Sequence, residues 1–290
     1  MVDWESMREP KKWRDWVINP FELKSKNFEV IKILGFPHAK NDVFYVKGLY
    51  REKECLAYIK CSRTSDVDFL KEAKLLQNYN LPNKPEIIEV DKCGKYIITK
   101  AARGKRLSKL LFENETLDVL VFMEKFGKKL AQIHKLDIKD VEVDDRKFFH
   151  IPSMEYCDKY GLNKYREYLI TNAPKQITTC FCHGDMHYAN VLWYKGEISA
   201  ILDYELSGLG NKEFDIAWSV ARRPSQKFMK TDAEFDAFIN GYKSENDCNI
   251  NSVKYYMVLI YLHFYKIGFE DKEYIDFIRE WLEKNCKNFK

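Results

Sequence analysis

The sequence predicts an α+β protein of two lobes, with a small mainly β lobe first and a larger mainly α lobe after it. Its 290 residues, of which 46% are hydrophobic, are more than a single core usually organises. Alternation of apolar and polar residues, which is typical of strands, dominates up to residue 99. Apolar residues at helical spacing dominate from about residue 117 onwards.

The first lobe combines predicted strands with one predicted helix. A helix from about residue 66 to residue 80 is indicated by Ser65 and Asp68, which resemble a helix N-terminus, and by the apolar residues that follow at helical spacing. Apolar runs bounded by turn residues indicate strands, the first three of them antiparallel, at residues 30–34, 43–46, 55–60, 87–91 and 96–99.

The connection between the lobes is expected to be short, because the chain has no internal repeat, low-complexity tract or Gly/Ser linker. We predict an N-terminal lobe over residues 1–99, a hinge over 100–106 and a C-terminal lobe over 107–290. In the last of these a helix is expected over about 117–134. The apolar run 255–265 predicts a buried helix, since it is shorter than the roughly 20 residues that cross a bilayer.

Composition bounds the partners and the location. The 48 basic and 44 acidic residues give a net charge of +4 with no block of one sign, so we expect no nucleic-acid partner and no membrane partner. The eight cysteines are scattered without a C-x-x-C pair, and no secretory signal is seen at the N-terminus. We therefore expect reduced thiols in a cytoplasmic protein. We also expect a monomer.

The segment after residue 178 carries the chemistry. Two apolar runs, 191–193 and 198–202, are joined by a tight turn and predict a hairpin, which brings Asn190 beside Asp203. A neutral and an anionic oxygen ligand together suit Mg²⁺. Asp185 lies in the adjoining loop as a separate carboxylate. A metal pair and a proton acceptor are what phosphoryl transfer needs.

Phosphoryl transfer also needs a cation on the phosphates. Lys60, at the end of the third strand, is placed as the strand lysine of kinases is, and Glu72 on the following helix can pair with it. Each residue alone would more often be a solvated surface group, so their order before the hairpin segment carries the hypothesis.

These residues resemble the aminoglycoside phosphotransferase and choline kinase superfamily. Its H-G-D-x-x-x-x-N motif corresponds to His183-Gly184-Asp185 with Asn190, and its D-x-E element corresponds to Asp203-Tyr204-Glu205. The similarity extends over roughly residues 30 to 220, and includes an L-x-x-L-H-like element that ends at His134.

The resemblance implies a protein-kinase-like fold with a nucleotide-binding N-terminal lobe and a catalytic, acceptor-binding C-terminal lobe. By resemblance, Asp185 is the catalytic base and Asn190 and Asp203 hold Mg²⁺. Lys60 with Glu72 orders the triphosphate of ATP or GTP. In the hinge, the C=O of Lys100 and the N–H of Ala102 face the adenine. One departure is the loop at 35–42, which has a single glycine where protein kinases have G-x-G-x-x-G.

Neighbouring residues have simpler explanations. Cys180, Cys182, His183 and His187 are too close together on a strand and loop for the usual zinc spacing. Asp215 is expected to hold the backbone of the catalytic loop, because the metal set is complete without it. A protein kinase is excluded because only eleven residues separate Asp203 from Asp215, too few for an activation loop.

The expected function is Mg²⁺-dependent phosphorylation of a hydroxyl on an aminoglycoside-like acceptor, which would confer antibiotic resistance. A kinase of choline, ethanolamine or another metabolite and, second, a non-catalytic nucleotide-binding module remain as alternatives. The acceptor is expected between the catalytic loop and residues 145–174 and 222–290, as a hydroxylated cationic molecule. The carboxylates available to bind such a cation are Asp232, Glu234, Asp236, Glu270, Asp271 and Glu273.

Overall fold

The computed structural model describes residues 15–37, 41–64 and 69–286. The chain divides into two compact units, the first made of residues 1–109 and 191–205 and the second of residues 110–190 and 206–290. Segment 191–205 thus belongs with the N-terminal part of the chain, although the sequence suggested a single boundary at 100–106. The reason is pairing, because the first strand of the predicted hairpin bonds to Lys105 and Arg106, the last two residues of the predicted hinge.

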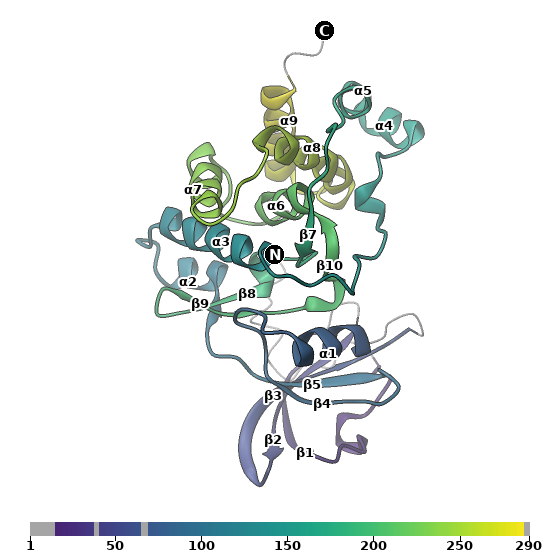
Figure 1. The fold of residues 1–290 in the computed structure, drawn as a ribbon, viewed down its shortest axis with the longest axis vertical. Helices are drawn as coiled ribbons and strands as arrows, with labels where there is room; N and C mark the ends of the chain where they lie inside the picture. The colour runs from purple at the N-terminus through teal and green to yellow at the C-terminus, as the bar shows by residue number, and fades with distance from the viewer. Residues whose placement is uncertain (1–14, 38–40, 65–68, 287–290) are drawn as a thin grey trace. The chain divides into compact units, whose positions relative to one another are not determined.

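The core of unit 1 is a five-stranded antiparallel sheet with the order β1-β2-β3-β5-β4 (Figure 1). Helix α1 (Phe69–Asn78) lies against β4 and β5, and the side chains of Phe44, Ile59 and Ile98 are fully buried. All five predicted strands are confirmed, while the predicted helix start at 65–68 lies outside the described residues. The strands are β1 (Phe28–Gly35), β2 (Asp42–Tyr50), β3 (Lys53–Cys61), β4 (Ile87–Val90) and β5 (Tyr96–Lys100).

The predicted hairpin is also confirmed. It forms a three-stranded sheet in the order β6-β8-β9, in which Val191 pairs with Ile201. Its turn residues Lys195 and Gly196 have φ values of 52° and 78°. Two successive left-handed residues are what a type I′ hairpin turn requires. The strands are β6 (Lys105–Arg106), β8 (Val191–Tyr194) and β9 (Glu197–Ile201).

Unit 2 is helical, with one two-stranded sheet formed by β7 (Thr179–Cys182) and β10 (Gly208–Asn211). Helix α3 runs along α7 (Figure 1), and both helices have a glycine at the contact. A Cβ on Gly127 would lie 1.9 Å from the carbonyl oxygen of Phe238, and one on Gly241 would lie 1.9 Å from that of Glu124. Only glycine therefore allows this close approach.

The remaining elements of the described chain are mainly helices. The apolar run predicted as a buried helix lies within α8, which packs on α6 and α9. Among the residues that the structure describes, no helix is both long and apolar enough to span a membrane. The helices are α2 (Leu107–Glu113), α3 (Val119–His134), α4 (Met154–Tyr160), α5 (Asn163–Thr171), α6 (Lys212–Val220), α7 (Asp232–Lys243), α8 (Ile250–Ile267) and α9 (Lys272–Asn285), with short 3-10 turns at Pro20–Glu22, Lys147–Phe149, Tyr188–Asn190 and Tyr204–Leu206.

Candidate active site

One lysine and three carboxylates form a charged centre in unit 1. The Nζ of Lys60, on β3, lies 3.0 Å from an Oε of Glu72 on α1, which is the predicted pair. The same Nζ lies 2.7 Å from Oδ1 of Asp203 and 3.4 Å from Oε2 of Glu205. Glu205 is the last residue of the D-x-E element, and its contact with Lys60 was not predicted from the sequence.

The excess of carboxylates shifts the pKa values in this centre. Burial raises the pKa of Glu72, and burial together with the charge of Asp203 raises the pKa of Glu205 to about 7. Burial alone would lower the pKa of Lys60, but its three carboxylate neighbours hold it well above its usual range. The centre therefore keeps its ammonium charge, and Lys60 is the cation that the described residues place within ion-pair distance of all three carboxylates.

The backbone around Asp203 is held in an unusual conformation. Its φ of 69° lies in the left-handed region, where aspartate is tolerated better than most residues. The second Glu72 oxygen accepts a hydrogen bond from the N–H of Tyr204 at 3.3 Å. Glu72 therefore holds both the lysine and the segment after β9. The carboxylate oxygens of Glu72, Asp203 and Glu205 lie within 4.8 Å of one another, a donor set that suits a hard divalent cation.

Asp185 lies in a tight loop of unit 2, directly after β7. The indole N–H of Trp218, on α6, donates a hydrogen bond to its Oδ1 at 2.7 Å. The side-chain amide of Asn190 donates to its Oδ2 at 3.2 Å, and Nε2 of His187 lies 3.7 Å from the same atom. These contacts fix the carboxylate while leaving about a fifth of the side chain exposed.

Asp215 holds the backbone of the loop that carries Asp185, as the sequence predicted. Its two oxygens accept hydrogen bonds from the backbone N–H groups of His183 and Gly184, at 2.9 and 3.0 Å. Gly184 has a φ of 80°, and a Cβ on it would lie 2.2 Å from the carbonyl oxygen of Leu206. The loop therefore needs glycine at this position.

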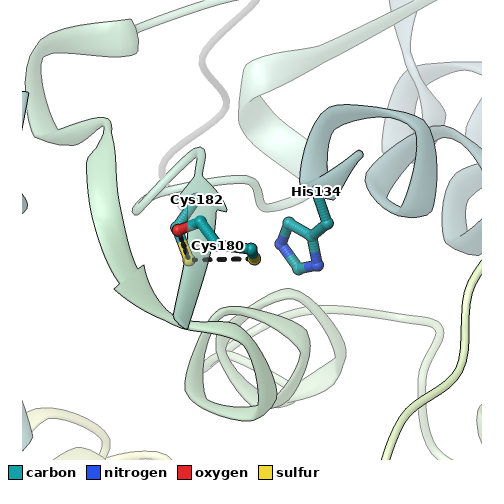
Figure 2. Close-up of side chains that lie close together, drawn as sticks. All are labelled: His134, Cys180 and Cys182. Atoms are coloured by element: carbon teal, nitrogen blue, oxygen red, sulfur yellow. Dashed lines mark hydrogen bonds between the residues drawn. The ribbon is translucent and has the colours of Figure 1, made fainter. Parts of the chain in front are cut away.

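Next to Asp215 lie the buried side chains of His134 and Cys182 and the half-buried side chain of Cys180 (Figure 2). The two Sγ atoms are 3.9 Å apart. The hydrogen bond from Cys182, with help from His134, lowers the pKa of Cys180 to about 6. The ring nitrogens of His134 are bonded to the hydroxyl of Tyr242 and to Asp215. A metal ion would have to displace one of these bonds, so we interpret the group as support for Asp215.

The predicted hinge residues lie at the end of β5. The N–H of Lys100 bonds the carbonyl of Glu86, and the N–H of Ala101 bonds that of Leu56. The adenine contacts of Lys100 and Ala102 stay predictions. The Asn190–Asp203 metal pair also stays a prediction, for which the register of Val191 opposite Ile201 is the one required. Residues 38–40 of the predicted phosphate loop lie outside the described residues.

The chain is similar to known phosphotransferases in sequence. A family model described as the phosphotransferase enzyme family matches residues 68–246, which is more than half of the chain. A stretch of 105 residues is 28% identical to mouse acyl-CoA dehydrogenase family member 10. That stretch covers 31% of this chain and only 10% of the mouse protein.

Solved structures share the fold at low sequence identity. An amicoumacin kinase, solved with AMP-PNP, Ca²⁺ and Ami, is 14% identical with a TM-score of 0.59, over 92% of this chain and 90% of that one. The macrolide 2′-phosphotransferase of Brachybacterium faecium is 16% identical with a TM-score of 0.54, over 90% and 94% of the two chains. A choline/ethanolamine kinase family protein of Mesorhizobium loti is 15% identical with a TM-score of 0.53, over 89% and 87%.

These likenesses confirm the kinase-like α+β fold that the sequence predicted, with an antiparallel sheet in the N-terminal region and a helical C-terminal region. The family model covers the helix of Glu72, the loop of Asp185 and the D-x-E element. This chain therefore belongs to the phosphotransferase enzyme family.

Proposed function

We propose that the chain transfers the γ-phosphoryl group of ATP or GTP to a hydroxyl of a small-molecule acceptor, with Mg²⁺ as cofactor. The observation that carries the proposal is the contact of Lys60 with Glu72 and Asp203, in a chain of the phosphotransferase family. In this arrangement Lys60 orders the phosphates of the donor, and Glu72 holds the lysine in place. Lys100 and Ala102 contact the adenine or guanine through their backbones.

The carboxylates of unit 1 fit a magnesium ion. Asp203 supplies an anionic oxygen, Asn190 a neutral one, and Glu205 a further carboxylate within reach of Asp203. When bound, Mg²⁺ neutralises the charge that develops on the phosphates. The protein contributes the ligands, and it contributes Lys60 as a fixed positive charge.

Asp185 is the proton acceptor in this proposal. The acceptor oxygen forms a bond to the γ-phosphorus, while the bond from that phosphorus to the bridging oxygen breaks and the nucleoside diphosphate leaves. The hydroxyl proton moves to a carboxylate oxygen of Asp185. The hydrogen bonds from Trp218 and Asn190 keep the carboxylate oriented, which is the positioning that phosphoryl transfer requires.

A coupled assay of ADP or GDP release tests the proposal over aminoglycosides, macrolides, choline and homoserine. With the acceptor that the screen finds, Asp185→Asn should lower turnover about 10²- to 10⁴-fold, because a general base is lost. The amide can still accept the bond from Trp218, so the variant should fold. Asp137→Asn, at an exposed aspartate paired with Lys139, is the control. Near-normal turnover in Asp185→Asn would reject the assignment.

The same screen decides between the candidate functions. Turnover of choline alone would establish a choline-type kinase, and turnover of an aminoglycoside or macrolide would establish an antibiotic kinase. Nucleotide binding without product from any acceptor would leave a non-catalytic nucleotide-binding module.

A further inference from the structure

Two arginines flank the aromatic side chain that holds the catalytic aspartate. The guanidinium carbon of Arg223 lies 5.0 Å from the ring centre of Trp218, and that of Arg146 lies 5.3 Å from it. The indole of Trp218 in turn donates its N–H to Asp185. Both guanidinium groups are close enough to Asp185 for its charge to act on their pKa values.

Neither arginine is neutralised by a bonded carboxylate within the described chain. The guanidinium group of Arg146 contacts the rings of Phe149 and Trp218, and it has neither a hydrogen bond nor an ion pair among the described residues. Nη1 of Arg223 donates to the carbonyls of Trp218 and Ala221, at the C-terminal end of α6. Its Nη2 is buried and, among the described residues, has no hydrogen-bond partner.

This state is costly, because a partly desolvated cation normally has a hydrogen-bonded counterion. Burial lowers the pKa of both arginines, which expresses that cost. The adjacent residue shows the usual solution, since Nη2 of Arg222 donates to Glu273 at 2.9 Å and its Nε donates to the carbonyl of Gln226. Arg222 is thus neutralised, whereas Arg223 keeps an N–H donor that is not used by the described residues.

A cavity beside the catalytic loop also offers a positive charge to a ligand. It has a volume of about 290 Å³, and Arg146 and Gly184 line it together with the aromatic side chains of Phe149, Phe214 and Tyr256. The carboxylate in its lining is Asp215, which is already bonded to His134 and to the loop N–H groups. The positive charge of Arg146 is therefore the charge that the cavity offers to a ligand.

Of the six carboxylates expected to bind a cationic acceptor, four have structural partners instead, and Glu270 is exposed. Glu234 is buried in the capping box of α7 with Thr231, and Glu273 pairs with Arg222 and Lys230. Asp271 caps α9, and Asp232 pairs with Lys284. Asp236 lines a different cavity, of about 210 Å³, together with three lysines.

We propose that the acceptor of this kinase is an acid, in which the phosphorylated hydroxyl and an anionic group, a carboxylate or a phosphate ester, belong to one small molecule. Arg146 and the unused Nη2 of Arg223 bind the anionic group, while Asp185 receives the hydroxyl proton. Guanidinium groups bind both kinds of anion through paired N–H donors. The inference rests on the proposed function and specifies its substrate class.

Matched acceptors test the charge directly. The assay of nucleoside diphosphate release is run with short hydroxy acids beside their primary amides, with sugar phosphates beside the free sugars, and with amino alcohols and aminoglycosides. We expect turnover in one of the two anionic series, which identifies the anion as carboxylate or phosphate. Equal use of charged and uncharged partners, or preference for the amino compounds, would overturn the inference and leave the proposed function standing. No product from any series would overturn both.

Variants then test the binding residues. Arg146→Gln should raise the KM of the anionic acceptor about 10- to 100-fold, the range expected for losing a hydrogen bond to a charged group, with the KM for ATP unchanged. Arg146→Lys should restore part of the affinity. Arg279→Gln, which removes an arginine over the ring of Tyr265, is the control and should change neither KM. An acceptor KM that does not respond to Arg146→Gln contradicts the assignment. Arg223 also caps α6, so Arg223→Gln is interpreted only after its unfolding temperature matches that of wild type.

Discussion

The charged centre of unit 1 and that of unit 2 are built with opposite signs. In unit 1 the ammonium of Lys60 is within ion-pair distance of Glu72, Asp203 and Glu205. In unit 2 the carboxylate of Asp185 lies near His187 and next to the tryptophan that the two arginines flank.

This difference indicates what each centre binds. Groups of one sign that are withdrawn from water raise the free energy of the folded chain unless a ligand supplies the opposite charge. Among the described residues of the unit 1 centre, three carboxylates face one bonded cation, and this negative surplus fits the proposed metal cation. In the unit 2 centre the two arginines have no bonded carboxylate among the described residues, and this positive surplus fits the proposed anionic group of the acceptor. Burial is the first cause both of the raised pKa of Glu205 and of the lowered pKa of Arg146, so in each centre a charged group is withdrawn from water.

The largest effect on turnover is expected when a carboxylate of the unit 1 centre is removed. Asp203→Ala should lower turnover by more than the 10- to 100-fold typical of losing an outer partner of a metal site, because it removes a proposed direct ligand of Mg²⁺. Asp203→Asn keeps a residue that tolerates the left-handed backbone, so it separates loss of charge from backbone strain. Turnover is measured against Mg²⁺ concentration, and Glu54→Ala, at an exposed ion pair, is the control.

Both Asp203 variants should need more Mg²⁺ than wild type, and Glu54→Ala should not. If Asp203→Asn has the Mg²⁺ requirement of wild type, the carboxylates of unit 1 do not hold the metal ion, and the comparison between the centres loses its basis.

The substitution Lys60→Ala should lower the kcat/KM for ATP and GTP strongly and the free energy of unfolding less strongly. Lys60→Ala leaves the buried Glu72 without its cation, so the free energy of unfolding should fall by less than the about 3–5 kcal/mol seen when a fully buried pair is broken, because Lys60 is partly exposed. Adding Glu72→Gln should recover much of the stability but none of the kcat/KM for ATP or GTP. Urea denaturation and steady-state kinetics on the two variants measure this.

The result separates two roles of the lysine. Recovery of both stability and kcat/KM in the double variant would mean that Lys60 only neutralises Glu72. A kcat/KM equal to that of wild type in Lys60→Ala would exclude a role in nucleotide use altogether.

Local patterns were sufficient for the fold and for part of the site. The hairpin follows from two apolar runs around Lys195-Gly196, and its turn geometry agrees with the sequence. Lys60 and Glu72 could be paired because each lies on an element with a clear periodicity. Asp215 could be given its structural role because the motif residues already accounted for the chemistry.

The rest of the site depends on tertiary packing. Arg146 lies in an irregular segment, and only the packing of that segment on α6 brings it to Trp218. The carboxylates after residue 231 can be read from the sequence, but the residues with which they pair cannot be predicted from it. Glu234 is the exception, because Thr231-x-x-Glu234 is a capping-box pattern that indicates a helix start rather than a binding site.

The smallest effect is expected on the pH dependence of the free energy of unfolding, through His134 and Cys180. Burial would lower the pKa of His134, but its bond to Asp215 and the neighbouring Cys180 raise it from 6.5 to about 9. A raised histidine pKa adds stability that is complete below pH 6.5 and is lost as the pH rises through about 9. Cys180 acts in the opposite sense, because its pKa is lowered from 9.0 to about 6, which adds stability above pH 9 that is lost as the pH falls through about 6.

The two contributions should therefore offset each other in wild type, whose free energy of unfolding should change little between pH 6.5 and 9. Cys180→Ser removes the thiolate but leaves Asp215 bonded to His134, so its stability should fall as the pH rises through this range. Urea denaturation at a series of pH values measures both curves. Cys248→Ser, at a buried cysteine that the structure places next to neither His134 nor Asp215, should follow wild type. A flat curve for Cys180→Ser would show that His134 is neutral in the folded chain. In that case the loop of Asp185 would be held by hydrogen bonds of Asp215 to a neutral ring, and the positive surplus of unit 2 would come from Arg146 and Arg223 alone.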